Sequence, residues 1–351
     1  MSSSHLLPFA SDYMEGAHPA ILKRLAETNR TPMPGYGTDA ISEAARAKIR
    51  AACQCPDADV YFLVGGTQTN ATVIDALLAS YQGVVAADTG HISLHEAGAI
   101  EFGGHKVLTL PHHSGKLRPE EVNAYLTAFE ADGNRDHMVM PGMVYISHPT
   151  EYGTLYTAAE LRRLHEICQA HKIPLFLDGA RLAYALACPE NEVSLPLIAA
   201  CCDAFYIGGT KCGTLFGEAV VFPQKDRAPH FFTIMKQHGA LLAKGWLLGL
   251  QFDTLFTDGL YEHLGRPAIQ AADTIRNALQ QYGYHLFFKT PTNQIFVIMP
   301  NEQLDRLAKE VSYSFWEAYD AEHTVIRLAT SWATTPEETQ QLLAVLAETA
   351  R

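Results

Sequence analysis

Residues 158–181 read AAELRRLHEICQAHKIPLFLDGAR, and this stretch decides the expected fold. Leu161, Leu164 and Ile167 recur at the spacing of a helix with one apolar face. A short, wholly apolar run at residues 174–177 follows directly. A one-sided helix that leads into an apolar strand is typical of a parallel sheet covered by helices on both faces.

The same alternation continues through most of the chain. Strands are expected at residues 60–64, 84–86, 106–110, 143–147, 174–177, 204–207 and 219–222. Helices are expected at residues 71–81, 119–130, 158–171 and around 196–201. Because strands joined by helical crossovers pair in parallel, the pattern predicts a mostly parallel, doubly wound α/β sheet.

The last third of the chain has a different pattern. Residues 228–282 are predicted to be one long helical, connecting region. Beyond it, strands are expected at 293–299 and 325–329 and helices at 302–310 and 336–349. We therefore predict a large domain over residues 1–257. A small C-terminal α+β domain is predicted over residues 258–351.

Composition excludes several classes of protein. Of 351 residues, 48% are hydrophobic and 18% charged, with a formal net charge of −12, which argues against nucleic acid as the main partner. No apolar run is long enough for a membrane helix, and the first residues lack the features of a secretion signal. Seven scattered cysteines favour free thiols in a reducing cytoplasm over disulfides or a zinc site.

Four polar segments follow expected strands, at the edge where sheets of this kind bind ligands. They are Gly65-Gly66-Thr67-Gln68-Thr69-Asn70, Asp88-Thr89-Gly90-His91-Ile92-Ser93-Leu94-His95-Glu96, Asp178-Gly179-Ala180-Arg181 and Gly208-Gly209-Thr210-Lys211-Cys212-Gly213. The first suits a monophosphate, because glycines and a helix N-terminus offer free N–H groups. It matches neither dinucleotide nor ATP fingerprints.

Each segment alone has an ordinary structural interpretation. A Gly-rich turn can be only a turn, Asp178 can cap a helix, and Lys211 or His91 can be a surface residue. Together they supply a phosphate cup, a ring-stacking imidazole, a buried carboxylate and an amine. Those are the groups that pyridoxal 5′-phosphate (PLP) requires, with the lysine forming its imine.

At these residues the sequence resembles the threonine aldolase/β-eliminating lyase family of fold-type I PLP enzymes. The resemblance spans nearly the whole chain and is strongest for the low-specificity L-threonine aldolase and phenylserine aldolase branch. It rests on Tyr36-Gly37-Thr38-Asp39, Gly66-Thr67-Gln68-Thr69-Asn70, Pro149-Thr150-Glu151-Tyr152-Gly153, Asp178-Gly179-Ala180-Arg181 and Thr210-Lys211-Cys212-Gly213.

The resemblance implies a role for each matching residue. Lys211 would be the Schiff-base lysine, Asp178 the partner of the pyridinium nitrogen, and His91 the residue stacked on the ring. Gly66, Thr67 and Gln68 would hold the phosphate, and Lys244 of a neighbouring subunit would reach it. Arg181 would lie near the phenolic oxygen of PLP and the substrate carboxylate, and Arg327 would bind that carboxylate. Ser11 and Tyr36 would line the substrate pocket. A homo-oligomer, dimer or tetramer, is implied, with the N-terminal segment 1–40 contributing to the active site and the subunit interface.

One position departs from the family pattern. Bacterial threonine aldolases of the better-known branch have a second histidine where this chain has Glu151. We therefore expect His91, Glu151 or a bound water to accept the proton of the β-hydroxyl group. His148 is adjacent to this segment in sequence.

The expected reaction is retro-aldol cleavage of a β-hydroxy-α-amino acid, such as L-threonine, L-allo-threonine or phenylserine, to glycine and an aldehyde. β-Elimination, or another PLP reaction on the same scaffold, is the alternative. A non-catalytic homologue is disfavoured, because Lys211, Asp178, Arg181 and Arg327 are all present. Metal catalysis finds no better candidates than the adjacent pair His112-His113.

Overall fold

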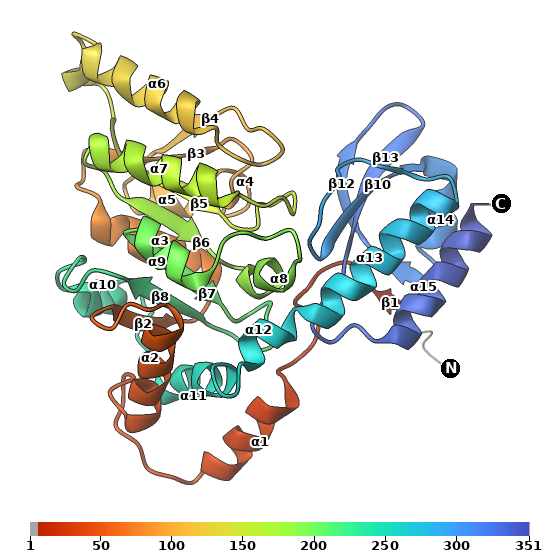
Figure 1. The fold of residues 1–351 in the computed structure, drawn as a ribbon, viewed down its shortest axis with the longest axis horizontal. Helices are drawn as coiled ribbons and strands as arrows, with labels where there is room; N and C mark the ends of the chain where they lie inside the picture. The colour runs from red at the N-terminus through yellow and green to blue at the C-terminus, as the bar shows by residue number, and fades with distance from the viewer. Residues whose placement is uncertain (1–5, 351) are drawn as a thin grey trace.

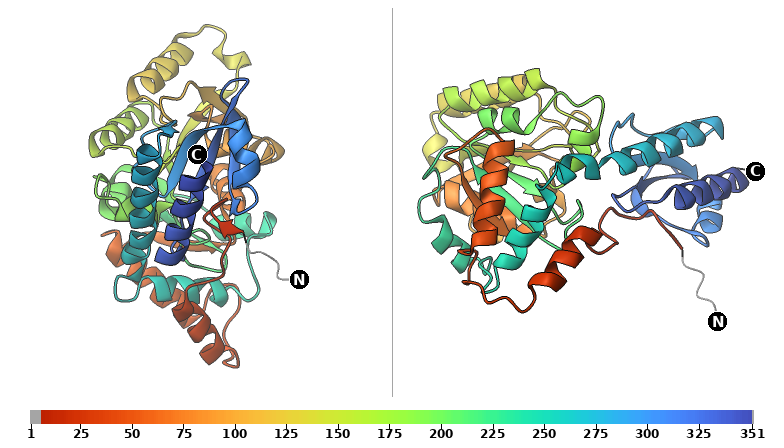
Figure 2. Two further views of the ribbon diagram at one scale, coloured as in Figure 1. Left: turned by 90° about the vertical axis from the view of Figure 1, so that its right-hand side faces the viewer. Right: turned by 60° about the horizontal axis from the view of Figure 1, so that its bottom comes forward.

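The computed structural model describes residues 6–350 as two lobes joined by a long helix (Figure 1). The larger lobe contains a seven-stranded sheet, and the smaller contains a four-stranded sheet. Helix α13 (Arg266–Gln281) leads from the large lobe into the small one. The N-terminal segment crosses between the lobes beside it (Figure 2). The two lobes are therefore connected twice.

The large sheet has its strands in the order β2-β8-β7-β6-β5-β3-β4. The strands are β2 (Asp59–Leu63), β3 (Gln82–Ala87), β4 (Val107–Leu110), β5 (Met140–Ser147), β6 (Leu175–Asp178), β7 (Ala204–Gly208) and β8 (Glu218–Phe222). Strand β8 is antiparallel to both of its neighbours, and the other pairs are parallel. The carboxyl ends of the other strands therefore meet at one edge, beside the start of β8. The mostly parallel sheet predicted from the sequence is confirmed.

Helices cover both faces of this sheet, and an apolar core lies on each side. One face carries α3 (Gly66–Leu77), α5 (Ala99–Phe102) and α10 (Phe231–Gln237). The other carries α2 (Ala40–Ala52), α6 (Pro119–Ala131), α7 (Ala158–Ala170), α8 (Leu182–Ala187), α9 (Leu195–Cys201) and α11 (Trp246–Leu255). The remaining helices of this lobe are α1 (Pro19–Thr28), α4 (His91–Leu94), α12 (Leu260–Leu264) and the 3₁₀ turn η1 (Arg135–His137).

The small lobe is an antiparallel sheet backed by helices. Its strands are β9 (His285–Leu286), β10 (Gln294–Pro300), β12 (Ser314–Ala318) and β13 (His323–Ala329), with α14 (Asn301–Leu307) and α15 (Pro336–Thr349). Strand β1 (Leu7–Pro8) pairs in parallel with β11 (Val311–Ser312), and Phe9 joins the core of this lobe. Along α13, Ile269 still packs in the large lobe, whereas Ala272 packs in the small one.

The sequence-based boundaries agree closely with the structure for the strands and less well for some helices. The helix expected to begin at residue 71 begins at Gly66, so most of the predicted phosphate loop is the first turn of α3. The region expected as one helical stretch is divided into α10, α11, α12 and α13. Breaks fall at Gly239 and Gly259, whose φ angles of 65° and 68° cannot continue a right-handed helix.

Within residues 6–350, no helix has both the length and the apolar character that crossing a bilayer would require.

The contact between α2 and α11 gives a test of this packing. A Cβ atom on Gly249 would lie 2.2 Å from Ser42 Oγ and 2.6 Å from Ser42 Cα. We expect Gly249→Val to lower the free energy of unfolding by about 1–3 kcal/mol, measured by urea denaturation, because overpacking forces the helices apart. Gly133→Ala is the control, since a Cβ there meets nothing within 4 Å. Equal midpoints for the two variants would contradict this close approach.

Candidate active site

Two cavities meet at the sheet edge where the strands end. The first has a volume of about 260 Å³ and the second about 460 Å³. Both are lined by Tyr13, His91, Glu151, Arg181 and Lys211. The first, which we call the inner cavity, also contains Gly66, Thr67, Ser147, Pro149, Asp178, Ala180, Tyr206, Thr210 and Glu218. The second, the outer cavity, reaches the small lobe through Leu94, His95, Tyr152, Ser314, Phe315, Trp316, Glu317 and Arg327.

The start of helix α3 forms one end of the inner cavity. Its N-cap residue, Gly65, makes no side-chain capping hydrogen bond, and the next residues, Gly66 and Thr67, line the cavity. The first N–H groups of a helix have no partner within it and carry partial positive charge, so they suit an anion. The Gln68 side chain turns away, and its amide donates to the carbonyl of His238 at 3.4 Å.

Asp178, the last residue of β6, is buried at the centre of the inner cavity. It accepts hydrogen bonds from the Tyr145 hydroxyl at 2.6 Å, the Asn70 amide at 3.1 Å, the Ala180 N–H at 2.9 Å and the Tyr206 hydroxyl. Burial alone would raise the pKa of this carboxyl, but His91 and the tyrosine hydroxyls outweigh it and hold the pKa below its ordinary value. Asp178 is therefore a fixed negative charge.

His91 begins the short helix α4, which follows β3. Its Nδ1 atom lies 2.7 Å from the buried Glu96 carboxylate, and Glu96 also accepts from Asn70 at 2.7 Å. A carboxylate at Nδ1 favours the proton on that nitrogen and leaves Nε2 available. Asn70 therefore links the carboxylate that orients His91 to Asp178.

Lys211 follows β7 and reaches the boundary of the two cavities. The Tyr184 hydroxyl donates to its backbone carbonyl at 2.6 Å, which fixes the turn. Burial and the adjacent Arg181 lower the pKa of Lys211, outweighing Asp12 and Asp178. A depressed pKa increases the fraction of neutral, nucleophilic amine.

Arg181 is held by a carboxylate that the sequence analysis did not select. Asp12 accepts from Arg181 Nε at 2.7 Å and from Nη2 at 3.0 Å, and Asn293 donates to the same carboxylate at 2.9 Å. This paired geometry fixes the plane of the guanidinium. The N-terminal segment, the large sheet and the small lobe therefore meet at one ion pair.

Arg327, on β13, closes the outer cavity from the small lobe. It donates to the Ala10 carbonyl at 3.0 Å, to Ser314 Oγ at 3.2 Å and to Gln294 Oε1 at 3.2 Å. Its guanidinium lies 5.9 Å from the ring centroid of Trp316, and within residues 6–350 its buried Nε has no partner. A fixed guanidinium opposite Arg181 suits a carboxylate ligand.

Comparison with known proteins places this site in a family. A β-eliminating lyase family model matches residues 8–312. The chain belongs to the β-eliminating lyase family. A low specificity L-threonine aldolase of Pseudomonas aeruginosa is 30% identical over 315 residues, which cover 87% of this chain and 88% of the relative. A second low specificity L-threonine aldolase, from a Pseudomonas sp. strain, is 30% identical over 85% of this chain and 86% of the relative.

Solved structures extend the comparison. A threonine aldolase of Leishmania major is 41% identical, with a TM-score of 0.95, over 98% of this chain and 99% of that one. Aspartate aminotransferase from Thermus thermophilus is 16% identical with a TM-score of 0.70, over 98% of this chain and 91% of that one, and shows a shared fold alone.

The inner cavity of this β-eliminating lyase family member fits pyridoxal phosphate. The helix start at Gly66 can hold the phosphate, and Asp178 is an anion suited to a protonated pyridine nitrogen. Lys211 supplies the amine, and His91 supplies a flat ring with one nitrogen already held by Glu96. Pyridoxal phosphate is therefore the cofactor for which this donor set is suited.

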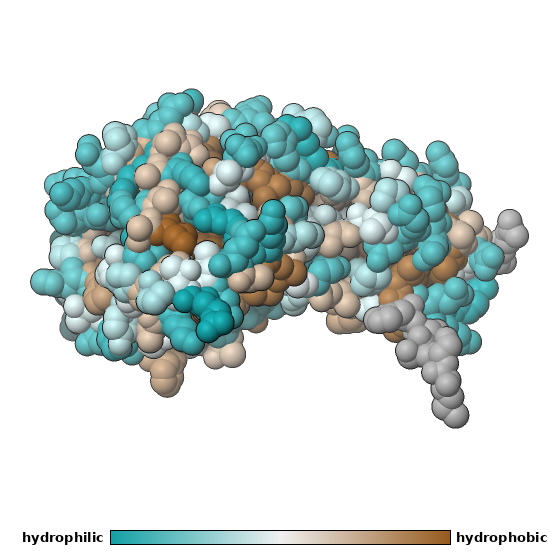
Figure 3. Space-filling view, turned by 90° about the horizontal axis from the view of Figure 1, so that it is seen from below, coloured by the Kyte–Doolittle hydropathy of each residue, from teal (hydrophilic) through white to brown (hydrophobic). Residues whose placement is uncertain are grey.

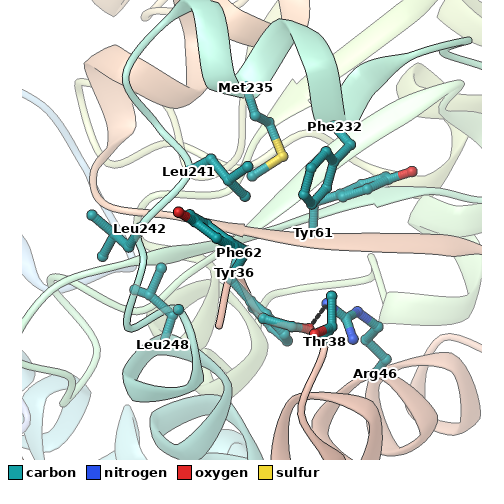
Figure 4. Close-up of a pocket in the computed structure, with 12 residues that line it drawn as sticks. Tyr36, Thr38, Arg46, Tyr61, Phe62, Phe232, Met235, Leu241, Leu242 and Leu248 are labelled. Carbon is teal, nitrogen blue, oxygen red and sulfur yellow. Dashed lines mark hydrogen bonds between the residues drawn. The ribbon is translucent and has the colours of Figure 1, made fainter. Parts of the chain in front are cut away.

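Several residues selected from the sequence do not line either cavity in this chain. Ser11 is buried but outside both, and its neighbour Tyr13 lines them instead. Tyr36 lines a separate cavity on the large lobe (Figure 4), and its N–H donates to the carbonyl of Ala243, beside Lys244. The role of Tyr36 in the substrate pocket therefore remains a prediction. So does the role of Lys244 of a neighbouring subunit at the phosphate.

Glu151 occupies the position at which the family pattern has a second histidine. Glu151 lines both cavities, and its Oε1 accepts from Ser147 Oγ at 2.7 Å and from the His91 N–H at 2.9 Å. His148 points away, with Nε2 at 3.1 Å from Asn191 Oδ1 and Nδ1 accepting from the Tyr156 N–H. Burial lowers the pKa of His148 to about 4.

Sequence reasoning missed several side chains of the site. They are Asp12, Tyr13, Asn70, His95, Glu96, Tyr145, Tyr206, Glu218 and Trp316. For Glu218 the signal was available, because a carboxylate that begins an otherwise apolar strand must be hydrogen-bonded if buried. Its Oε2 accepts from the Gly209 N–H at 2.9 Å, and burial raises its pKa to about 7.

The Asp12–Arg181 pair predicts how stability depends on pH. Burial raises the pKa of Asp12, but Arg181 and Lys211 prevail and lower it from 3.8 to about 2. Because the pKa is depressed in the folded chain, the stabilisation is complete above the unfolded value and is lost as pH falls toward 2. Between pH 5 and pH 2, the parent should lose about 2 kcal/mol of unfolding free energy relative to Asp12→Asn.

Urea unfolding at a series of pH values measures this difference. Asp136→Asn, at an exposed residue of η1, is the control and should follow the parent at every pH. If the Asp12→Asn and parent curves stay parallel, Asp12 is not the depressed carboxylate described above.

Proposed function

We propose that this protein is a PLP-dependent carbon–carbon lyase that cleaves β-hydroxy-α-amino acids to glycine and an aldehyde. The observation that carries this function is the junction of two cavities at Lys211 and Arg181, with Asp178 in the inner cavity and Arg327 in the outer one. The relatives named L-threonine aldolase support it, because they match the chain over most of its length.

When bound, pyridoxal phosphate supplies an electron sink for the pair left on a substrate's α-carbon. The residues of this chain would hold the cofactor and the substrate in place. Asp178 would provide a negative charge for the ring nitrogen, and the start of α3 would hold the phosphate. Lys211 would provide the amine that holds the cofactor.

The arginines define the orientation of the substrate. Arg181 is fixed by Asp12, and Arg327 is fixed by Ala10 and Ser314, so both guanidinium planes are set before ligand binding. A carboxylate bound between them leaves the side chain of the amino acid in the outer cavity. Orientation of this kind selects which bond to the α-carbon is broken.

Kinetics and product analysis test the proposed reaction. The purified protein should release glycine and the matching aldehyde from L-threonine, L-allo-threonine or L-phenylserine. Lys211→Ala should lose this activity by at least about 10³-fold, together with the absorption of the lysine-bound cofactor, because the amine is removed. Lys225→Ala, at an exposed turn, is the matched control and should retain both.

Two other results would contradict the proposal. Pyruvate and ammonia from serine or cysteine, without glycine from any β-hydroxy amino acid, would identify a β-eliminating enzyme. Absence of turnover and of a Lys211-dependent absorption band would identify a non-catalytic member of the family.

We also propose that the protein is a cytoplasmic homo-oligomer, a dimer or tetramer, with its active sites between subunits. The described cysteines are all free, which fits a reducing compartment. Apolar groups reach the surface of the large lobe (Figure 3), and Tyr36 and Phe232 are 43% and 45% exposed beside an apolar hollow (Figure 4). A second subunit covering this surface would bring Tyr36 and Lys244 toward the neighbouring site.

A charge on that surface tests the assembly. Phe232→Glu should convert the oligomer to a smaller species in light scattering, because a carboxylate would be buried in an apolar contact. It should also weaken cofactor binding in spectroscopic titration, since Lys244 would no longer be supplied. Phe102→Glu, at a 96% exposed residue elsewhere on the lobe, is the control. An unchanged mass for Phe232→Glu would show that this surface is not the interface.

A further inference from the structure

The outer cavity contains a histidine to which the sequence assigned no function. His95 ends helix α4 one turn after His91, and its N–H donates to the His91 carbonyl at 2.9 Å. Residues four apart on a helix lie on the same side, so both imidazoles face the cavities. His91 lines both cavities, whereas His95 lines only the outer one. His95 therefore lies in the part of the site that is farther from Asp178 and the start of α3.

The aromatic neighbours of His95 define its position in the outer cavity more closely. The ring centroid of His95 is 5.7 Å from that of His91 and 6.5 Å from that of Trp316. Trp316 in turn contacts Arg327, the proposed carboxylate ligand of the small lobe. The imidazole of His95 thus lies between the residue that faces the cofactor ring and the residue that fixes the substrate carboxylate. A β-hydroxy-α-amino acid whose carboxylate is bound by Arg327 would carry its β-carbon toward this interval.

Within the described residues, both ring nitrogens of His95 are free, whereas His91 keeps only Nε2 free, because Glu96 holds its Nδ1. In the chain from residue 6 to residue 350, no group hydrogen-bonds to the ring of His95. By contrast, two donors occupy one oxygen of Glu151. Those contacts fit positioning roles for His91 and Glu151. His95 keeps a nitrogen free to accept a proton from a ligand.

The charges around His95 favour the neutral form of the ring. Burial lowers the pKa of His95 below 6.5, and the neighbouring His91, Arg327, Arg181 and Lys211 act in the same direction. The carboxylates that line the same cavity are Glu151 and Glu317. A neutral imidazole at pH 7 is the form that a general base requires.

We propose that His95 is the general base that takes the proton of the substrate's β-hydroxyl group. This inference rests on the proposed aldol cleavage and assigns the step left open by Glu151 at the family's second histidine position. A free imidazole nitrogen accepts the hydroxyl proton, the oxygen forms the aldehyde C=O, and the Cα–Cβ bond breaks with its electron pair left on Cα. A solvent proton then adds to Cα to give glycine, and His95 returns its proton to solvent.

Two substitutions test the assignment in the full-length holoenzyme. His95→Asn keeps a polar group, and His95→Phe keeps an aromatic ring, but neither can accept the proton. Both should lower kcat for cleavage of L-threonine and L-phenylserine by about 10²- to 10⁴-fold, the usual contribution of a general base. The acid limb of the kcat/KM profile, set by a group titrating below pH 6.5, should disappear.

Two further measurements separate a base from a structural residue. Exchange of the glycine α-proton with D₂O, followed by NMR, requires the cofactor, Asp178 and Lys211 but no β-hydroxyl group. Exchange, and the dissociation constants of cofactor and glycine, should stay within about threefold of the parent. His137→Asn, at an exposed histidine of η1, is the matched control and should behave as the parent throughout.

The outcomes are distinct. If the parent cleaves the substrate and His95→Asn does so within about threefold of the parent rate, the assignment is overturned and the proposed function stands. Loss of cleavage and of glycine exchange in parallel would also overturn it, because His95 would then act on the cofactor. A large loss confined to Glu151→Gln would transfer the role to Glu151. Absence of cleavage in the parent would overturn both the function and the inference.

Discussion

The ion pair between Asp12 and Arg181 is the interaction on which the arrangement of the site depends. Both groups are buried, and a buried charge without a partner would cost several kcal/mol. Asp12 meets this requirement for Arg181 and accepts at the same time from Asn293 of the small lobe. The N-terminal segment cannot leave the junction without exposing or unpairing a charge. The pair therefore sets the distance between the lobes, and with it the distance between Arg181 and Arg327.

The remaining charges of the junction follow from the topology of the sheet. Parallel strands bring their carboxyl ends to one edge, so that the turns after β6 and β7 are neighbours. A Cβ on Gly208 would lie 2.4 Å from the Ala180 carbonyl, so only glycine allows these turns to approach this closely. Asp178 and Lys211 are thus placed in one cavity, and the antiparallel strand β8 adds Glu218 from the opposite direction. The amine is surrounded by carboxylates yet keeps a depressed pKa, because burial and Arg181 dominate.

The sequence predicted those parts of the fold that depend on local pattern. Wholly apolar strands such as β6 and β7, and the polar residues that end them, could be recognised because each signal lies within a few neighbouring residues. The start of α3 was missed, since Gly66 and Thr67 are poor helix formers that tertiary contacts hold in the first turn. Asp12 was missed for a different reason. Asp12 is 169 residues from Arg181 along the chain, and only the folded structure shows that they pair.

The division into two cavities suggests where the choice of reaction is made. The inner cavity contains what any PLP enzyme of this fold requires, so Asp178, His91 and Lys211 cannot by themselves distinguish aldol cleavage from β-elimination. The difference lies in which bond is held for cleavage and in which group of the substrate loses or gains a proton. In the proposed reaction the arginines control the first, and the side chains that line the outer cavity control the second. In aldol cleavage the hydroxyl must lose its proton, whereas in elimination it must gain one to leave as water. A neutral imidazole beside two arginines favours loss of the proton, so His95 and its charged neighbours bias the site toward carbon–carbon cleavage.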